Sequence, residues 1–234
     1  MIKFTKVDKV YKDGQKSLSD VNIGIKQGEF VFLVGHSGAG KSTMLKLLLR
    51  EEKISSGRLT VLGEDISKIK NKKMHLFRRK LGVIFQDFRL LKDKTAYENV
   101  ELSMRVVGTR KKDIKPRILE VLDKVGLLDK AKKYPSELSG GECQRVAIAR
   151  AIVNKPSIII ADECTGNLDL ENSIEIIKIL NEINKEGTTV IMATHDIELL
   201  KIFNKRTIEL KGGVIVRDTK GEVYEDNILY FIQY

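Results

Sequence analysis

The 234-residue chain is poor in several residue types, and each scarcity excludes a class of protein. It contains no tryptophan, three prolines and two cysteines, Cys143 and Cys164. Two cysteines cannot build the framework of a disulfide-rich secreted domain, and no Cys/His cluster has the spacing of a zinc site. Only 6% of the residues are aromatic and no nucleic-acid-binding motif occurs, so we expect no specific nucleic-acid partner.

Long apolar runs are also missing. No stretch approaches the ~18–20 apolar residues that a membrane-spanning helix needs, and residues 1–11 lack the apolar core of a signal peptide. We therefore expect the chain to stay in the cytosol unless a partner holds it at a membrane. With 42% hydrophobic and 32% charged residues, the composition is typical of a globular protein with a substantial core.

The chain is basic, with a net charge of +10. Part of the excess lies between Lys68 and Lys80, where seven basic residues occur and no acidic one. The simpler interpretation of this run is a solvated helix face. The alternative is a surface that attracts anionic lipid headgroups or nucleic acid, and the low aromatic content argues against nucleic acid.

Strand and helix patterns alternate along most of the chain, which predicts an α/β fold with a parallel sheet. Residues 1–28 have the pattern of short alternating strands with a turn at Asp13-Gly14, which indicates a β-subdomain. Buried strands are predicted at Phe30–Val34, Lys80–Phe85, Ser157–Ala161 and Thr188–Thr194. Helices are predicted at Lys41–Leu49 and Asn172–Ile183, and a hairpin at Thr207–Leu210 and Val214–Arg217 with its turn at Gly212-Gly213.

Residues 87–150 have a helical pattern and are interpreted as an insertion into this alternation. We expect Asp113 to cap one of these helices and Pro116 to lie in its first turn, where proline is tolerated. Gly126 is expected to end the same helix. The apolar face predicted for it consists of Ile114, Ile118, Val121, Leu122 and Val125.

A complete phosphate-binding loop lies between a predicted strand and a predicted helix: Gly35-His36-Ser37-Gly38-Ala39-Gly40-Lys41-Ser42. Its glycines permit backbone conformations that aim N–H groups at phosphate oxygens, and the helix N-terminus attracts anions. We expect the loop and Thr43 to hold the phosphates of ATP. Lys41 would lie between the β- and γ-phosphates, and Ser42 would be a ligand of Mg²⁺.

Four polar residues follow the ends of predicted strands, where open α/β sheets bind ligands. Asp162 is predicted to be a carboxylate ligand on the Mg²⁺ side, and Glu163 to polarise the attacking water as a general base. Taken singly, Gln86 would be an ordinary loop residue and His195 a hydrogen-bonded core residue. Their assignment to the site depends on the whole set.

The segment Leu138-Ser139-Gly140-Gly141-Glu142 is the most distinctive of the chain. Ser139 and the amides of Gly140 and Gly141 open a predicted helix that runs to Arg150, so this segment also suits a phosphate. The chain already has a phosphate loop, and the economical interpretation is that the segment contacts the γ-phosphate held by a second chain. We therefore expect a homodimer that encloses two ATP molecules.

These motifs, in this order over nearly the whole chain, resemble the ABC ATPase family. The resemblance implies Mg²⁺-dependent ATP hydrolysis at a site shared between two protomers. It implies a role in catalysis for Lys41, Glu163 and His195, and Mg²⁺ coordination by Ser42, Gln86 and Asp162. It also implies that Asp169 and the segment Ser139 to Glu142 contact nucleotide, and that Tyr11 stacks on the adenine, although Tyr11 alone would equally suit a core position.

The same resemblance implies an ABC-type nucleotide-binding domain over residues 1–234. Residues 1–86 and 151–234 would form an ATP-binding core with a RecA-like parallel sheet and an antiparallel β-subdomain. Residues from about 87 to 150 would form an α-helical subdomain that contains Leu138–Glu142.

Finer segments are similar to the cell-division branch of this family: Phe77–Asp87, Lys124–Lys130, Ala151–Pro156 and Met192–Asp196. This similarity implies an integral membrane partner resembling FtsX, contacts with other division proteins, and control of peptidoglycan hydrolases outside the cell. The chain would lie peripherally on the cytoplasmic face of the bacterial cell membrane at the division site. The coupling surface would be the groove beside Gln86 and the helical insertion, including Phe88 to Glu98.

Two positions depart from the family, which usually has Gln at Cys143 and Pro at Cys164. Cys143 lies near a helix N-terminus that would lower its pKa and make it redox-sensitive. The alternatives are ordinary reduced cysteines, which is the simpler interpretation, or cysteines introduced for labelling. The tail from Glu222 to Tyr234 is too short to span a membrane, and we expect it to pack on the core or to fray.

Two other functions are compatible with the motifs. One is a scaffold that binds nucleotide and anchors division proteins, with hydrolysis incidental. The other is a DNA-associated ABC ATPase, and the lack of a long coiled-coil insertion argues against it.

Overall fold

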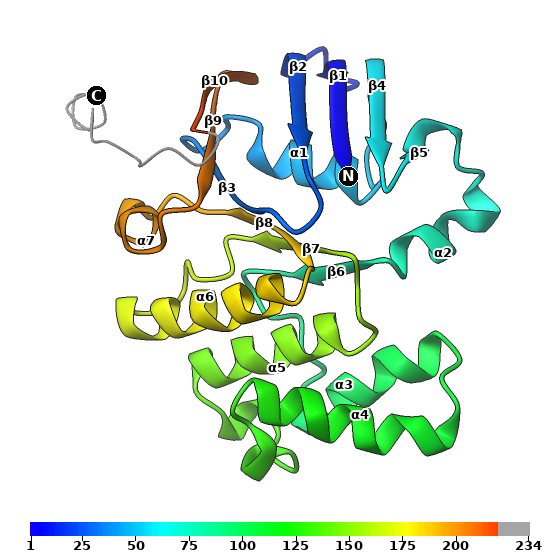
Figure 1. Cartoon of the computed structure of the whole chain (residues 1–234), viewed down its shortest axis with the longest axis vertical. Helices are drawn as coiled ribbons and strands as arrows, with labels where there is room; N and C mark the ends of the chain where they lie inside the picture. The colour runs from blue at the N-terminus through cyan, green and yellow to red at the C-terminus, as the bar shows by residue number, and fades with distance from the viewer. Residues whose placement is uncertain (220–234) are drawn as a thin grey trace.

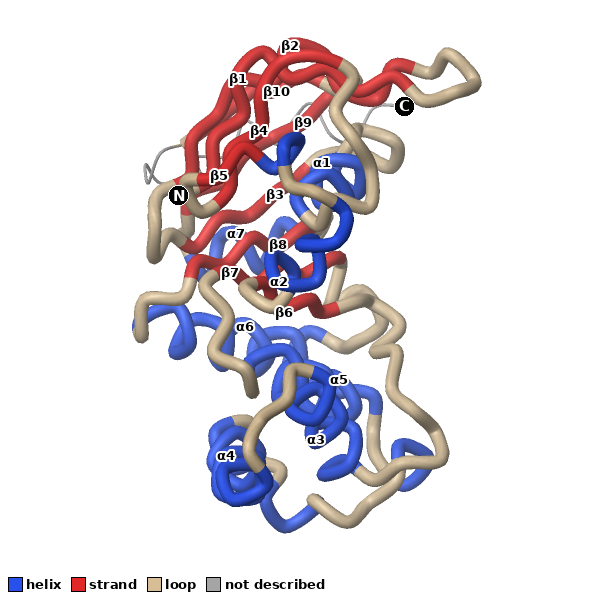
Figure 2. The backbone as a smooth tube through the Cα atoms, turned by 90° about the vertical axis from the view of Figure 1, so that its right-hand side faces the viewer, coloured by secondary structure: helices blue, strands red, loops and turns tan. Residues whose placement is uncertain are grey.

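Two β-sheets lie next to each other, and a group of helices covers the far face of the larger sheet (Figures 1 and 2). The computed structural model describes residues 1–219. The larger sheet has the order β10-β9-β3-β8-β7-β6. Five of its strands are parallel, and β10 (Val214–Asp218) pairs antiparallel at the edge. The parallel strands are β3 (Phe30–Val34), β6 (Leu81–Ile84), β7 (Ile158–Asp162), β8 (Thr189–Ala193) and β9 (Arg206–Lys211).

The buried strands of this sheet have apolar side chains on both faces. On β3, Phe30 and Phe32 face the helical layer, whereas Val31 and Leu33 face the second sheet. Successive side chains of a strand point to opposite faces, so a strand with a core on each side must be apolar throughout. This burial explains why the predicted strands are confirmed to within one or two residues, and the hairpin β9–β10 turns at the predicted glycines.

The second sheet is antiparallel and has the order β2-β1-β4-β5. Its strands are β1 (Ile2–Val10), β2 (Lys16–Ile25), β4 (Ser56–Val61) and β5 (Glu64–Asp65). Helix α1 (Lys41–Leu48) shares one apolar core with this sheet and the larger one. The chain passes from β5 to β6 through the 3₁₀ turns η1 (Ile66–Lys68) and η2 (Asn71–Lys73) and the short helix α2 (Met74–Arg78).

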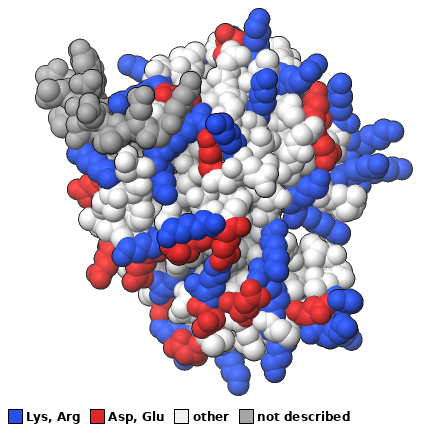
Figure 3. All heavy atoms as spheres, in the orientation of Figure 1, with Lys and Arg blue, Asp and Glu red and all other residues white. Residues whose placement is uncertain are grey.

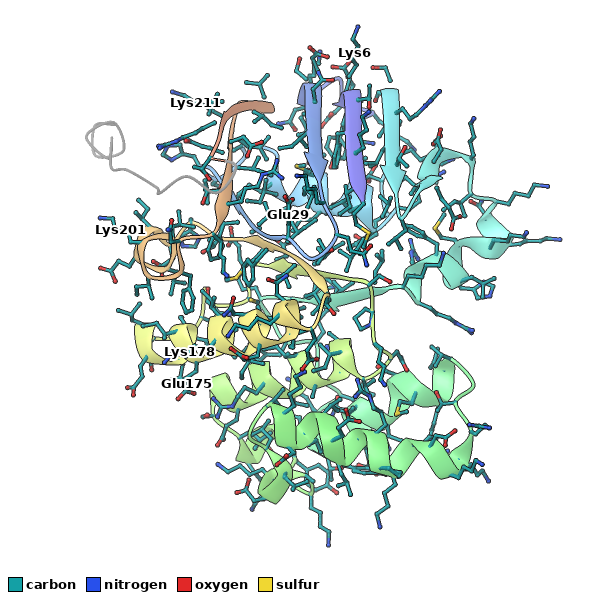
Figure 4. The ribbon with its side chains drawn as sticks, viewed as in Figure 1. Lys6, Glu29, Glu175, Lys178, Lys201 and Lys211 are labelled. Atoms are coloured by element: carbon teal, nitrogen blue, oxygen red, sulfur yellow. The ribbon has the colours of Figure 1, made fainter. Side chains whose placement is uncertain are left out.

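The helical layer is built on amphipathic helices, most of which have a side chain as N-terminal cap. Its members are α3 (Ala96–Val106), α4 (Lys111–Lys124), α5 (Gly140–Ile152) and α6 (Leu170–Lys185), with turns η3 (Leu128–Lys130) and η4 (Pro135–Glu137) between α4 and α5. A short helix, α7 (Ile197–Phe203), follows β8. Glu175 on α6 accepts a hydrogen bond from Arg145 on α5 (2.9 Å), which ties the two helices together where Figure 4 labels Glu175.

The start of α4 differs from the prediction. Its N-cap residue is Arg110, so Asp113 is not the cap: it lies inside the first turn, with its carboxylate 2.7 Å from Arg110 Nε. Pro116 lies in the second turn rather than the first. A cap at Asp113 would have started the helix at Ile114, but the helix starts three residues earlier, at Lys111. This earlier start is favourable because the helix dipole stabilises an acidic side chain in the first turn.

None of the helices in the described residues is long and apolar enough to cross a membrane. The tail from Glu222 to Tyr234, which we expected to pack on the core or to fray, lies outside the described residues.

Candidate active site

The phosphate loop joins β3 to α1 and depends on glycine at two points. Gly35 has φ +146°, and a Cβ atom there would lie 2.3 Å from the carbonyl oxygen of Leu210. Gly40 has φ +107°, and a Cβ atom there would lie 2.8 Å from the carbonyl oxygen of Ser17. Any larger residue would therefore clash with backbone that cannot move away. The loop is fixed in shape by the strand and turn around it, which suits a rigid anion site.

Lys41 begins α1 and points back across the loop. Its side chain is only 7% exposed, and its ammonium group donates hydrogen bonds to the carbonyl oxygens of Gly35 (2.6 Å) and His36 (3.2 Å). The same nitrogen lies 3.8 Å from Oε1 of Glu163. A buried cation is therefore held between the loop and a carboxylate from another strand.

A cavity of about 480 Å³ opens in front of this cation. The residues that line it come from four places in the chain: Val34, Gly35, His36, Ser37, Lys41, Glu163, His195, Ile197 and Leu200. The structure thus brings together the loop, the acid after β7 and the histidine after β8. The remaining loop residues differ in exposure: Gly38 and Ser42 are exposed, whereas Ala39, Gly40 and Thr43 are buried.

Glu163 has an unusual backbone conformation. Its φ is +47°, in the left-handed region that a residue with a side chain rarely adopts. Its N–H donates to the carbonyl oxygen of Ala193 (3.1 Å), which helps to hold the turn. The carboxylate lies 3.7 Å from Nδ1 of His195. Strain of this kind persists where the surroundings fix it, and functional sites are where it concentrates.

Three oxygen donors near the loop fit the preferences of Mg²⁺. Asp162 is half-buried, and its pKa is raised by burial and by the neighbouring Glu163 carboxylate. The hydroxyl of Ser42 has no hydrogen-bond partner among residues 1–219. Mg²⁺ is usually held by one or two carboxylates together with phosphate oxygens and waters, so a single carboxylate here is sufficient.

Gln86, the third of these donors, follows β6. Its Nε2 donates to Oδ1 of Asn167 (3.4 Å), and a Cβ atom on Gly166 would lie 3.0 Å from that nitrogen. The Gln86 side chain therefore lies against the turn that follows Glu163. The parallel pairing of β6 with β7, in which Ile84 faces Ala161, produces this proximity.

Tyr11 reaches the start of α1 from the second sheet. Its hydroxyl lies 3.1 Å from Oγ1 of Thr43, which in turn lies 2.7 Å from Oγ of Ser17. Lys9 places its ammonium nitrogen 4.7 Å from the centre of the Tyr11 ring. The half-buried ring is thus held beside the phosphate loop, where it can offer a stacking surface. No pattern in the sequence predicts that Ser17 contacts Thr43.

The segment Leu138–Glu142 forms the start of α5, as predicted. Ser139 caps the helix by accepting a hydrogen bond from the N–H of Glu142 (3.3 Å), and the Glu142 carboxylate accepts one from the N–H of Ser139 (2.9 Å). Glu142 also pairs with Lys130, and that hydrogen bond, with those from Ser139, lowers the pKa of its carboxyl. Ser139 and Gly140 are exposed, and neither lines the cavity in front of Lys41.

Asp169 has a structural role in the single chain. It caps α6 by accepting a hydrogen bond from the N–H of Asn172 (2.8 Å), and its two carboxylate oxygens each accept one from the Asn172 amide (2.9 Å each). Asn172 in turn lies against Gly141, where a Cβ atom would be 2.4 Å from Oδ1 of Asn172. Asp169 and the start of α5 are therefore neighbours, and neither lines the cavity in front of Lys41.

The prediction that the helix N-terminus lowers the pKa of Cys143 is wrong. Cys143 is only 7% exposed, and burial, followed by the Glu142 charge, raises the pKa of its thiol. Cys164 is fully buried, which raises its pKa to about 12. Both cysteines are free. Desolvation of the thiolate outweighs the helix dipole at Cys143, so neither thiol has the character of a reactive cysteine.

Two further residues of α5, Gln144 and Arg150, contact the segment around Gln86, and these contacts were not predicted from the sequence. The buried Gln144 donates from Nε2 to the carbonyl oxygen of Phe85 (3.5 Å). The Arg150 guanidinium donates to the carbonyl oxygens of Phe88 (2.6 Å) and Arg89. Because Phe88 and Arg89 both have positive φ, Arg150 stabilises an irregular backbone directly after Gln86. An arginine in a helical pattern carries no local signal of such a contact.

Comparison with known proteins agrees with this geometry. The family model described as ABC transporter matches residues 18–166. The cell division ATP-binding protein FtsE of Bacillus subtilis is 50% identical over 223 residues, which cover 95% of this chain and 98% of that protein. FtsE of Escherichia coli K12 is 49% identical over 91% of this chain and 96% of its own, and FtsE of Mycobacterium tuberculosis 48% over 96% and 98%.

Solved structures of related proteins have the same fold. The ATP-binding cassette MJ0796, a dimer bound to ADP and Pi in a post-hydrolysis state, has a TM-score of 0.83 and 38% identity over 93% of this chain and 97% of its own. The cbiO1 protein of Clostridium perfringens, part of the transporter complex cbiONQ, has a TM-score of 0.87 and 31% identity over 93% and 87%.

Proposed function

Because this chain belongs to the ABC transporter family, and within it to the FtsE group of cell-division ATP-binding proteins, we propose that it is an Mg²⁺-dependent ATPase that acts as a homodimer. The observation that carries this proposal is the convergence of Lys41, Glu163 and His195 on one cavity beside the phosphate loop. Tyr11 would stack on the adenine at the other end of the loop.

The residues around the cavity would have separate roles in ATP hydrolysis. Lys41 would bind the β- and γ-phosphates, exchanging its loop carbonyl contacts for phosphate oxygens. Glu163 would accept a proton from the attacking water, and His195, close to the same carboxylate, would orient that water and the γ-phosphate. Mg²⁺, held by Ser42, Asp162 and Gln86, would supply positive charge to the phosphate oxygens.

The second protomer would complete the site. Ser139 and Gly140 are exposed and do not line the chain's own cavity, so the Ser139 hydroxyl and the Gly140 N–H would be available to a γ-phosphate held by a partner. An exposed helix N-terminus binds anions through its free N–H groups. The dimeric arrangement of MJ0796 with ADP and Pi supports this arrangement for the present chain. Asp169, next to the start of α5, would lie at the same interface.

A groove linked to the loop after Gln86 through Arg150 would receive the membrane partner, although Phe88 to Glu98, which we expected in the coupling surface, do not line it. Its volume is about 580 Å³, and α2, α3 and α5 line it with residues that include His75, Arg78, Val106, Arg150 and Asn154. Val106, which is 69% exposed, gives this lining an apolar side chain open to a partner. Arg150 lines the groove and donates hydrogen bonds to the carbonyl oxygens of Phe88 and Arg89. A partner element bound in the groove would therefore be coupled to the loop after Gln86.

We infer that this partner is an integral membrane protein resembling FtsX, as the FtsE names of the relatives suggest. The chain would then lie on the cytoplasmic face of the bacterial membrane at the division site. Closing and opening of the ATP dimer would be transmitted through the partner to control peptidoglycan hydrolases outside the cell.

Substitution of Glu163 tests the proposed chemistry and the dimer together. Glu163→Gln should bind ATP but hydrolyse it about a thousandfold more slowly, which corresponds to ~4 kcal/mol of transition-state stabilisation. With ATP and Mg²⁺ it should elute as a dimer in size-exclusion chromatography with light scattering. Adding Ser139→Arg should return it to a monomer that still binds ATP. The control Glu51→Gln, on an exposed turn, should keep wild-type turnover.

Near wild-type turnover of Glu163→Gln would reject the assigned base. A Glu163→Gln, Ser139→Arg protein that remained a dimer would reject the shared site.

A further inference from the structure

The segment from Lys70 to Lys80 has two unlike faces. One face, with Asn71, Met74, His75 and Arg78, lines the groove shared with α3 and α5. The other face, with Lys70, Lys73, Leu76 and Lys80, lines a separate hollow of about 690 Å³. Residues three or four apart share a face of a helical segment, so η2 and α2 separate the two sets. The basic run of the sequence is therefore sorted by the fold and is not spread evenly over a solvated face.

Cations dominate the lining of this hollow, which we call the lysine hollow. Four lysines line it, Lys68, Lys70, Lys73 and Lys80, together with Glu64, Asp65, Ile69, Leu76 and Phe77. Figure 3 shows Lys and Arg side chains projecting together at the right-hand edge, where Figure 1 places α2.

The two acidic residues of the lysine hollow are already engaged. Glu64 lies 2.9 Å from the ammonium group of Lys80. Asp65 accepts hydrogen bonds from the N–H (3.1 Å) and hydroxyl (2.6 Å) of Ser67, and lies 3.7 Å from Arg58. Lys70 and Lys73 have no acidic partner within residues 1–219. Two unneutralised ammonium groups thus share a concave surface, which attracts a multivalent anion.

An exposed apolar side chain lies beside these ammonium groups. Leu76 is 47% exposed and lines the lysine hollow between Lys73 and Lys80 in sequence. Cations next to an exposed leucine are the pattern of surfaces that contact both the headgroups and the outer acyl region of a bilayer. An exposed leucine would not contribute to binding the phosphate backbone of a duplex nucleic acid.

We propose that the lysine hollow binds the phosphate headgroups of anionic phospholipids at the membrane surface. This inference rests on the proposed function in one respect. If the groove on the other face of α2 receives a membrane protein, the lysine hollow is held close to the bilayer. Lys68, Lys70 and Lys73 then bind lipid phosphates, and Leu76 enters the interface. Contact with the bilayer would then help to orient the ATPase, in addition to its contact with the membrane protein.

Vesicle flotation of the whole purified chain tests this inference without the membrane partner and without ATP. The probes are vesicles of phosphatidylcholine with 30% phosphatidylglycerol, and vesicles of phosphatidylcholine alone, at about 0.1 M salt. The wild type should float with the anionic vesicles only. Lys70→Glu with Lys73→Glu should weaken binding by about tenfold or more, since each cation near an anionic surface contributes a several-fold factor. Binding of the wild type should also weaken as salt rises.

The matched control is Lys111→Glu with Lys112→Glu at the exposed start of α4, which makes the same change in net charge. It should keep at least half of the wild-type binding. Thermal melting checks that each variant is folded, and Lys70→Gln with Lys73→Gln replaces the reversal if that variant fails to fold. Leu76→Ala should reduce binding less than the charge reversal does.

Equal loss in both charge-reversal variants would overturn the inference, because net charge alone would explain binding. Failure of the wild type to float with anionic vesicles would also overturn it. So would displacement of the protein from vesicles by a 20-base-pair duplex at equal phosphate concentration. Loss of ATP turnover in Glu163→Gln does not bear on any of these results, so the failure of either proposal is recognised separately.

Discussion

The ammonium nitrogen of Lys41 lies 3.8 Å from Oε1 of Glu163, so it joins the phosphate loop to the turn after β7 that carries the proposed base. The two residues are 122 positions apart in the sequence, and the pairing of β3 with β8 and of β8 with β7 brings them together. In the proposed function, this pair would set both the affinity for a phosphate and the position of the carboxylate that activates water.

Substituting Lys41 should therefore act first on binding. Lys41→Ala removes charge-assisted hydrogen bonds to phosphate, which are worth ~1.5–3 kcal/mol each, so ATP affinity should fall by about ten- to a hundredfold. Titration with a fluorescent ATP analogue measures this change. Lys46→Ala, an exposed lysine on the same helix, should leave affinity within about twofold. Unchanged affinity in Lys41→Ala would contradict the phosphate role.

Ser139 serves as helix cap and proposed phosphate contact, and two substitutions separate these roles. Ser139→Ala should lower the free energy of unfolding by ~1 kcal/mol through loss of the cap. Ser139→Asp retains the cap, so its stability should stay close to that of the wild type. Its carboxylate would nevertheless repel a γ-phosphate, and turnover should fall more than in Ser139→Ala. Urea unfolding and phosphate release measure the two effects, and parallel losses in both variants would argue against a phosphate contact.

The two glycines at the start of α5 should differ in their response to alanine. In Gly141→Ala the new Cβ meets Oδ1 of Asn172 at 2.4 Å, and Asp169 holds that side chain in place. Stability should fall by ~1–2 kcal/mol from overpacking. In Gly140→Ala the nearest atom, Cδ2 of Leu168, is 3.5 Å away, so stability should change by less than ~0.5 kcal/mol. Urea unfolding compares the pair, and equal losses would contradict the contact with Asn172.

Both thiols should be unreactive in the folded protein. Burial raises the pKa of Cys143, and that of Cys164 reaches about 12, so thiolate is scarce at pH 8. Ellman's reagent should modify both at least ~100-fold faster in denaturant than in buffer. Rapid reaction of one thiol in buffer, mapped to Cys143 by peptide mass, would restore the redox-sensitive interpretation.

Asp8 predicts a pH dependence of stability. Hydrogen bonds from Ser56 and Lys16 lower its pKa from 3.8 to about 2, and through them the carboxylate ties β1 to β4 and β2. Because the folded pKa is the lower one, the stabilisation is fully present above pH 3.8 and is lost as the pH falls towards 2. The stability gap between wild type and Asp8→Asn should be constant from pH 7 to about 5 and should narrow at pH 3. A gap that widened on acidification would contradict this sign.

Much of the fold could be predicted because local patterns determine it. The continuous apolar run Phe30–Val34 and the isoleucine-rich run Ile158–Asp162 identify buried strands, and glycine spacing identifies the phosphate loop. Ser139 followed by Glu142 is a capping box that predicts the start of α5. The start of α4 was predicted wrongly because Asp113 is favourable both as a cap and in a first turn, and local sequence does not distinguish these positions.

The rest depends on contacts between distant segments. The pairing of Phe4 with Leu59 places β4 beside β1, although 55 positions separate the two residues. No pattern in either strand indicates that the two strands pair. The pKa of Cys143 depends on how closely the chain packs around it, which helix position alone does not specify. The hydrogen bonds of Gln144 and Arg150 to the Gln86 loop were missed for the same reason.

The helix α5 has Ser139 at its N-cap, and near its other end Arg150 donates hydrogen bonds to Phe88 and Arg89. A helix of this length is a stiff rod of ~20 Å, because each residue adds about 1.5 Å. A tilt of ~10° about its middle would move each end by ~2 Å in opposite directions. In the proposed dimer, this rod would act as a lever with its fulcrum in the helical layer: a push from a partner's phosphate at one end would displace the loop beside the proposed partner groove at the other.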